Sequence, residues 1–184
     1  MKKLLMAVAF LAAGAVPAAA QGQGSADPSN TIYLEAPQGR VVIRLRPDLA
    51  PQHAERLKIL TRQGFYDGVP FHRVIDGFMA QTGDPTGTGT GGSKLPDLKA
   101  EFSPTSFKRG SIGMARASSP NSANSQFFIV YKDAPWLNNQ YTYVGDVVSG
   151  MEAVDKLRKG PESANGVVPN PDRVKSMKLM ADAK

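Results

Sequence analysis

The sequence has 184 residues, of which 41% are hydrophobic and 21% are charged, a balance that suits one globular domain and excludes both a disordered tail and a polytopic membrane protein. The chain contains no cysteine, which excludes disulfides, thiolate metal sites and cysteine nucleophiles. The net charge of +6 does not indicate a nucleic-acid partner, because Lys2 and Lys3 lie at the extreme N-terminus and no later run of Lys and Arg follows.

The N-terminal segment has the pattern of a signal peptide. Lys2 and Lys3 precede an apolar stretch over residues 4–16, which is too short and too rich in Ala and Gly for a good membrane span. Small residues follow at positions 18–20 and predict cleavage after Ala20. We therefore expect residues 1–20 to be removed on export, leaving a periplasmic or secreted protein with no stable membrane anchor. An uncleaved N-terminal anchor is the less favoured alternative.

Residues 21–30 are rich in Gly, Gln, Ser, Asp and Pro, a composition that buries too little apolar surface to order itself. We expect a flexible linker there and a folded domain over residues 31–184. The domain opens with two runs, 31–35 and 40–46, in which every second residue is apolar, on either side of a Pro-Gln-Gly turn sequence. This pattern predicts a β-hairpin.

The rest of the domain contains two helix patterns among short strand patterns. A helix is expected to begin near Pro51, with Ala54, Leu57 and Leu60 at helical spacing, and a second is expected over residues 151–159, before a Gly-Pro pair. The remaining apolar runs predict strands over residues 71–75, 78–80, 111–115, 127–130, 143–148 and 174–180. The fold class is therefore mainly β. Two helices are too few to alternate with these strands, so we expect a closed antiparallel eight-stranded barrel with a helix at each end.

Common catalytic templates do not fit. Residues 87–92 match the pattern G-x-G-x-x-G, but no helix pattern follows, so a flexible loop is the better interpretation. The sequence contains no G-x-S-x-G or H-E-x-x-H pattern. His53 is expected to be exposed or to cap the first helix, and His72 is expected to be structural. We predict neither a metal site nor a cofactor.

Two segments concentrate aromatic, Met and uncharged polar residues: FHRVIDGFMAQTGD over residues 71–84 and GSIGMARASSPNSANSQFFIV over residues 110–130. With these segments, followed by Trp136 and Leu137, the chain resembles the cyclophilin family of peptidyl-prolyl cis/trans isomerases from about Thr31 to the C-terminus. The resemblance implies a cyclophilin-like barrel and catalysis of X–Pro isomerisation without a cofactor. Its implied partners are proline-containing unfolded or partly folded polypeptides.

The chemistry of these residues agrees with that function. Rotation about an X–Pro bond has a barrier of about 20 kcal/mol, and a catalyst must hold the proline ring in an apolar slot while it stabilises the twisted amide. Arg73 is the natural hydrogen-bond donor to the prolyl nitrogen, and Gln81 could hold its guanidinium in place. Side chains suited to the slot are Phe78, Met79, Phe128 and Leu137. On an extended strand Phe128 faces opposite to Phe127, so one ring can line the slot while the other fills the core.

Matched residue by residue, the resemblance implies that Arg73 is the catalytic residue and that Gln81 holds the Arg73 side chain in place. Ala115 and Arg116 fall where the family binds the substrate backbone, with Arg116 in a position that often holds Asn. Tyr141 replaces a frequent pocket His, and Trp136 matches a position associated with cyclosporin binding. We therefore expect a prolyl isomerase that assists the folding of exported proteins. The alternative is a peptide-binding chaperone that uses the same groove without significant catalysis.

Overall fold

The computed structural model describes residues 27–183, so the predicted signal peptide and residues 21–26 of the predicted linker lie outside the described part. The end of the predicted linker differs from expectation. It forms the 3₁₀ helix η1 (Pro28–Asn30), and the Asp27 carboxylate accepts hydrogen bonds from the Ser29 N–H at 2.9 Å and the Asn30 side-chain amide at 2.7 Å. Regular structure therefore begins before residue 31.

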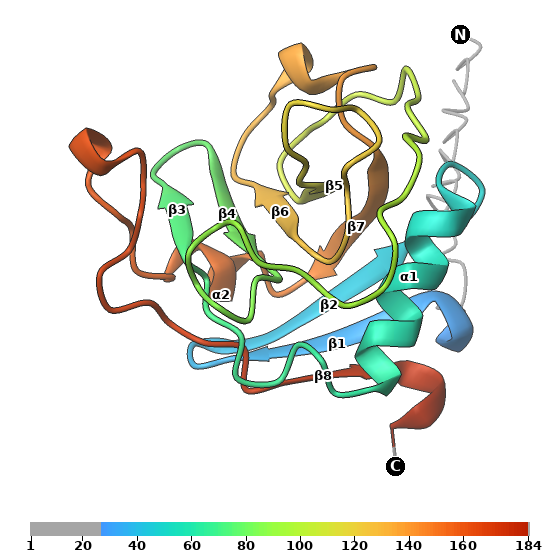
Figure 1. Ribbon diagram of the computed structural model, residues 1–184. Coiled ribbons are helices and arrows are strands. Elements are labelled where there is room, and N and C mark those ends of the chain that lie inside the picture. The colour runs from blue at the N-terminus through green and yellow to red at the C-terminus, as the bar shows by residue number, and fades with distance from the viewer. Residues whose placement is uncertain (1–26, 184) are drawn as a thin grey trace, which may run out of the picture.

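Within residues 27–183 all eight predicted strands are present, and they form one antiparallel sheet (Figure 1). Their order across the sheet is β3-β4-β6-β5-β7-β2-β1-β8. In chain order the strands are β1 Thr31–Ala36, β2 Gly39–Leu45, β3 Arg73–Ile75, β4 Met79–Thr82, β5 Ser111–Met114, β6 Phe127–Val130, β7 Tyr143–Ser149 and β8 Ser176–Leu179. The alternation that predicted the hairpin reflects burial: its apolar side chains enter the core, and the residues between them face outward or are half-buried.

The sheet is an open half-barrel, so the prediction of a closed barrel was wrong. In the described part of the chain, the end strands β3 and β8 do not pair with each other. Irregular chain fills the gap instead: the Gly68 N–H donates to the Val174 carbonyl, and the Phe71 N–H donates to the Asp172 carbonyl, both at 2.8 Å. The pairing is limited to isolated bridges such as Pro70 with Arg173, and the prolines at positions 70, 169 and 171 reduce the hydrogen bonds of a ladder because they have no N–H to donate.

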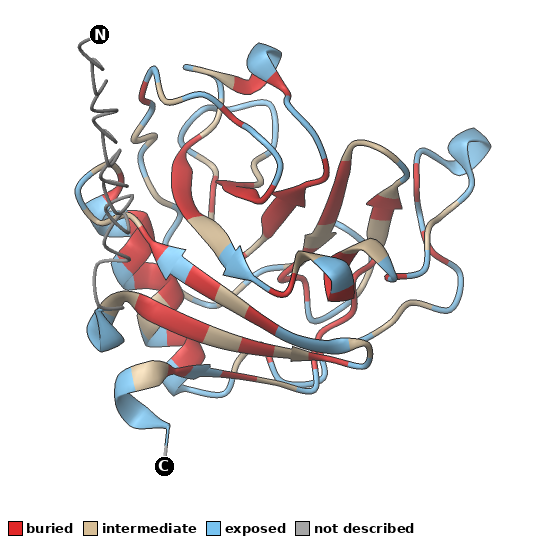
Figure 2. Cartoon of the chain, turned by 180° about the vertical axis from the view of Figure 1, so that it is seen from behind, coloured by how far each residue is buried: buried red, intermediate tan, exposed pale blue. Residues whose placement is uncertain are grey.

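In the part of the chain that the structure describes, two α-helices pack against the sheet. The helix α1 (Pro51–Arg62) contacts β7 and β8, and α2 (Met151–Asp155) contacts β2. Figure 2 shows the buried residues concentrated on the strands and along one side of α1, with most exposed residues in the connecting loops. No helix within residues 27–183 is long and apolar enough to cross a membrane.

The helix α2 ends four residues earlier than the predicted end at residue 159. The following backbone N–H groups are used elsewhere, because Arg158 donates to the Asp172 carboxylate at 2.8 Å and Gly160 donates to the Val74 carbonyl at 3.0 Å. These bonds draw the chain toward β3, so the helical pattern of the sequence is overridden by tertiary contacts.

His53 differs from the exposed or capping residue that the sequence suggested. Its side chain is fully buried, and its Nδ1 lies 2.7 Å from Oε2 of Glu101. The Glu101 carboxylate also accepts the backbone N–H groups of Gln52 and His53, each at 3.1 Å. The cap of α1 is therefore supplied by Glu101 from a distant loop, and negative charge at this end of the helix is favourable.

Strand β6 separates two apolar clusters and thereby positions the site. Phe127 and Ile129 belong to the main core, which includes residues of both helices. Phe128 and Val130 belong to a second cluster, because successive side chains on a strand face opposite sides. This arrangement confirms the predicted opposition of Phe127 and Phe128. It also leaves Phe128 on the side of the sheet where the cleft described next is found.

Candidate active site

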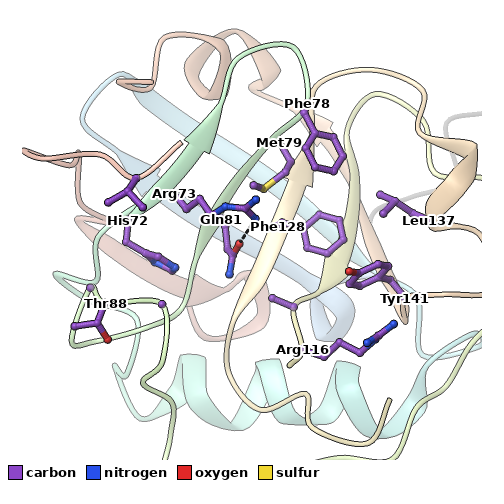
Figure 3. A pocket seen from close by; sticks show the side chains of 14 residues that line it. His72, Arg73, Phe78, Met79, Gln81, Thr88, Arg116, Phe128, Leu137 and Tyr141 are labelled. Atoms are coloured by element: carbon purple, nitrogen blue, oxygen red, sulfur yellow. Dashed lines mark hydrogen bonds between the residues drawn. The ribbon is translucent and has the colours of Figure 1, made fainter. Parts of the chain in front are cut away.

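A cleft of about 320 Å³ opens over the second apolar cluster. Figure 3 shows its lining, with polar side chains around Arg73 and aromatic and aliphatic side chains around Phe128. Of the ten residues that the sequence assigned to the site, nine line the cleft: Arg73, Phe78, Met79, Gln81, Ala115, Arg116, Phe128, Leu137 and Tyr141. The tenth, Trp136, is 58% exposed and lies at the rim, with its ring centroid 5.9 Å from that of Phe78.

Strand register brings the central residues into one row across four neighbouring strands. Arg73 on β3 is paired with Gln81 on β4, and Gln81 is paired with Phe128 on β6. Phe128 is in turn paired with Gly113 on β5. Directly paired residues place their side chains on the same face of a sheet. The pairing therefore places the guanidinium, its amide partner and the aromatic ring side by side.

The apolar half of the cleft is a closely packed slot. Phe128 packs in a stacked arrangement on Phe107, with ring centroids 6.0 Å apart, and meets Tyr141 edge to face at 5.5 Å. Phe128, Met79 and Leu137 are almost completely buried. The position of the Phe128 ring depends on Gly113, because a Cβ at residue 113 would overlap with the Phe128 ring.

The Arg73 guanidinium is held by three neutral acceptors. Its Nη1 donates to Oε1 of Gln81 at 3.2 Å, its Nε donates to the Asn165 carbonyl at 3.0 Å, and its Nη2 donates to Oδ1 of Asn165 at 2.9 Å. Since a guanidinium carries five N–H groups, two make no hydrogen bond to the described residues and are available to a substrate. Burial lowers the pKa of Arg73 from its ordinary value, but an arginine remains charged in this setting.

A hydrogen-bond chain links Gln81 to the loop beside the cleft. The Gln81 amide donates to Oε1 of Gln126 at 2.8 Å, and the Gln126 amide donates to the carbonyls of Gly89 and Gly91 at 3.0 and 2.8 Å. In each of the two Gln side chains the amide oxygen accepts a hydrogen bond and the amide nitrogen donates one. These partners fix the orientation of both side chains.

Asp84 anchors that same loop, which the sequence suggested to be flexible. Its fully buried carboxylate accepts hydrogen bonds from the N–H groups of Thr86, Gly89 and Gly91 at 2.8, 2.6 and 3.1 Å, and from the Thr86 hydroxyl at 2.7 Å. Burial alone would raise the pKa of Asp84, but these hydrogen bonds outweigh burial and lower it to about 2. The loop that borders the cleft is thus built around one ionised carboxylate.

Sequence reasoning missed several residues at the site. His72 was interpreted as structural, yet it lines the cleft, and its buried imidazole nitrogens have no hydrogen-bond partner among the described residues. Burial lowers the pKa of His72. Val167 and the loop residues Gly87, Thr88 and Gly89 also line the cleft. The position of His72 directly before Arg73 was the available signal. For Val167 and for Asn165, which contacts Arg73, no pattern in the sequence indicated a role.

Comparison with known proteins identifies the family. The sequence model described as "Cyclophilin type peptidyl-prolyl cis-trans isomerase/CLD" matches residues 31–179. The chain belongs to this family. A "Probable peptidyl-prolyl cis-trans isomerase" of Brucella suis biovar 1 is 53% identical, and the match covers 100% of this chain and 98% of that protein. A peptidyl-prolyl cis-trans isomerase-like 3 of Rattus norvegicus is 39% identical over 71% of this chain and 83% of its own length.

Solved cyclophilin structures have the same fold. The cyclophilin AquaCyp293 of Hirschia baltica has a TM-score of 0.76 at 25% identity, covering 86% of this chain and 76% of that one. A cyclophilin-type isomerase of Cryptosporidium parvum, crystallised in the presence of the dipeptide Ala-Pro, has a TM-score of 0.74 at 29% identity, covering 81% and 98%. Together with the family match, these relatives identify the chain as a peptidyl-prolyl cis-trans isomerase.

Proposed function

We propose that this cyclophilin binds proline-containing segments of unfolded or partly folded polypeptides in the cleft and that Arg73 is its catalytic residue. The observation that carries this proposal is the position of the Arg73 guanidinium beside an apolar slot, held by Gln81 and Asn165. The similar Cryptosporidium parvum protein was crystallised in the presence of the dipeptide Ala-Pro, which supports a proline ligand.

In the proposed mechanism the proline ring occupies the slot formed by Phe78, Met79, Phe128 and Leu137. As the X–Pro amide twists, the prolyl nitrogen loses conjugation and becomes a better hydrogen-bond acceptor, and an N–H of Arg73 donates to it. This bond is stronger in the twisted state than in either planar state, so it lowers the barrier instead of only tightening binding. The acceptors that hold Arg73 are neutral, and no ion pair with a described residue compensates its positive charge, which strengthens the bond in a partly buried site.

Catalysis is favoured over the alternative of a chaperone that only binds peptides. The relatives carry isomerase names, and this chain has both Arg73 and Gln81, which peptide binding alone does not require. Peptide binding alone requires apolar contact area, whereas a positioned cationic donor is required only to stabilise the twisted amide during catalysis.

Substitution of Arg73 tests the assignment. In an isomerisation assay on a proline tetrapeptide, Arg73→Lys should lose much of the turnover and Arg73→Ala more, because a lysine ammonium cannot reproduce the planar fork of arginine. Each tenfold loss corresponds to about 1.4 kcal/mol of transition-state stabilisation. Peptide affinity should change little, since the slot is intact. Arg44→Ala, which removes an exposed arginine from β2, is the control. Wild-type turnover in a folded Arg73→Ala protein would refute the role.

We further propose that the enzyme is exported and assists folding in the periplasm or outside the cell. The support is the order of two lysines, an apolar stretch and small residues over positions 1–20. X–Pro bonds in newly exported chains isomerise over tens to hundreds of seconds without a catalyst, so an exported isomerase would accelerate a slow folding step. Mass spectrometry of the protein from its native host should find Gln21 at the N-terminus. Intact Met1 in a cytoplasmic fraction would contradict export.

A further inference from the structure

Arg116 lies on the wall between the cleft and a second, adjoining cavity of about 460 Å³. The residues common to both linings are Gln81, Gly89, Ala115 and Arg116. Of these four, Arg116 alone carries a charge. A peptide that fills the proline slot and continues toward the second cavity therefore has to pass its guanidinium.

The guanidinium of Arg116 is held in a fixed orientation. Its Cζ lies 4.7 Å from the centroid of the Tyr141 ring. Its Nε and Nη2 donate to the Gln140 carbonyl at 3.2 and 3.1 Å, and its Nη1 donates to the carbonyls of Ala117 and Ser118 at 3.0 and 3.3 Å. These bonds use four of the five N–H groups of an arginine and leave one on Nη2. Stacking on an aromatic ring also stabilises a cation in this position.

The positive charge of Arg116 is not balanced by an ion pair with any residue that the structure describes. Within residues 27–183 none of the ion pairs includes Arg116, and all its hydrogen-bond acceptors are neutral carbonyls. The described residues that line the cleft include Arg73 and Arg116 but no Asp or Glu. The second cavity contains one acid, Asp97, whose Oδ1 accepts the Asn124 amide at 2.9 Å. Among the lining residues, the proline side of the wall therefore carries two positive charges and no negative one, whereas the second cavity has one of each sign.

We propose that Arg116 makes the enzyme prefer substrates in which a residue flanking the proline carries an acidic side chain. A carboxylate on that residue would meet the remaining N–H of Arg116 and a charge that forms no ion pair within residues 27–183, whereas a lysine there would be repelled by both arginines. This inference rests on the proposed binding of proline in the cleft, and it goes beyond it by naming a substrate class.

Matched peptides test the preference. Two sets of peptides with blocked termini, Ala-Ala-X-Pro-Ala-Ala and Ala-Ala-Pro-X-Ala-Ala, carry Glu, Gln or Lys at X, and exchange NMR measures kcat/KM without a protease. In at least one set the wild-type enzyme should favour Glu over Gln by about threefold and Gln over Lys by a similar factor, as expected for a partly exposed charge pair. The preference should shrink between about 0.05 M and about 1 M salt, where the screening length falls to roughly 3 Å.

Variants of Arg116 assign the preference to this residue. Arg116→Glu should reverse the order, so that the Lys peptide becomes the better substrate, and Arg116→Gln should make the Glu and Gln peptides equal. Lys178→Glu makes the same change in net charge on β8, at a residue that lines neither cavity, and should keep the wild-type order. If Arg116→Glu does not fold, the Arg116→Gln variant still shows whether Arg116 causes the preference for the Glu peptide.

Two results would overturn the proposal, and they are distinguishable. If the wild-type enzyme accelerates Glu, Gln and Lys peptides equally in both sets, or if Arg116→Gln keeps the Glu preference, the role of Arg116 is wrong while the proposed function stands. If the wild-type enzyme accelerates none of the peptides, the proposed binding of proline in the cleft fails, and the inference fails with it.

Discussion

Both oxygen atoms of Asn165 accept hydrogen bonds from the Arg73 guanidinium, although 92 positions separate the two residues in the chain. Asn165 follows the 3₁₀ helix η3 (Glu162–Ala164) and has a φ of 51°, in the left-handed region that Asn tolerates better than most residues. This backbone conformation points its carbonyl and its side chain at the same guanidinium. The loop between α2 and β8 therefore contributes directly to the geometry of the proposed catalytic group.

Asn165→Gly should lower turnover by roughly fivefold while changing KM little, because it removes one neutral acceptor worth about 1 kcal/mol and leaves the carbonyl acceptor in place. Gly accommodates the positive φ without strain, so the loop is expected to keep its course. Steady-state kinetics on a proline peptide would measure the effect, and the thermal unfolding midpoint would show that the fold is retained. Equal turnover of variant and wild type would show that the Asn165 side chain does not position Arg73.

The sequence predicted the parts of the molecule in which local pattern and tertiary structure agree. The alternation over β1 and β2 and the spacing of Leu57 and Leu60 in α1 both correspond to burial. The open edge of the sheet was not predicted, because it depends on which irregular segments meet between β3 and β8. The prolines at positions 70, 169 and 171 are visible in the sequence, but no local pattern shows that their segments lie at the edge. Asn165 was missed for the same reason: it lies in a turn-rich loop, and its role arises from contact with Arg73, which no spacing in the sequence encodes.

The shape of the slot depends on the absence of a side chain at Gly113. In Gly113→Ala the new Cβ would overlap with the Phe128 ring and would approach Cε1 of Phe107 to 2.8 Å. One ring would have to move, which we expect to destabilise the protein by about 1–3 kcal/mol and to raise KM by displacing Phe128. Urea unfolding together with peptide kinetics would check both effects. An Ala variant with wild-type stability and KM would mean that the rings can shift without consequence for the slot.

Trp136 should make the enzyme sensitive to cyclosporin. Its ring is 58% exposed at the rim of the cleft, close to Phe78, so a ligand can cover its face and accept a hydrogen bond from its indole N–H. Trp136→Phe removes that donor and part of the ring area, and it should weaken inhibition by more than it lowers turnover. Inhibition curves would compare it with Phe102→Leu, which changes an exposed aromatic residue outside the cleft. Identical inhibition of the Trp136→Phe and wild-type enzymes would exclude this contact.

Because of Asp84, the free energy of unfolding should fall when the pH is lowered below about 4. Its pKa in the folded protein is lowered from the ordinary 3.8 to about 2, so its contribution is complete above roughly pH 4 and is lost as the pH falls toward 2. At about 1.4 kcal/mol per pKa unit, this contribution is about 2 kcal/mol. Asp84→Asn should therefore be clearly less stable than the wild type at pH 6, and the difference should narrow between pH 4 and pH 2. Urea unfolding at a series of pH values would measure it, with Asp76→Asn, an exposed residue in the turn before β4, as the control. A difference between Asp84→Asn and wild type that stays constant down to pH 2 would contradict a role for the ionised carboxylate in holding the loop.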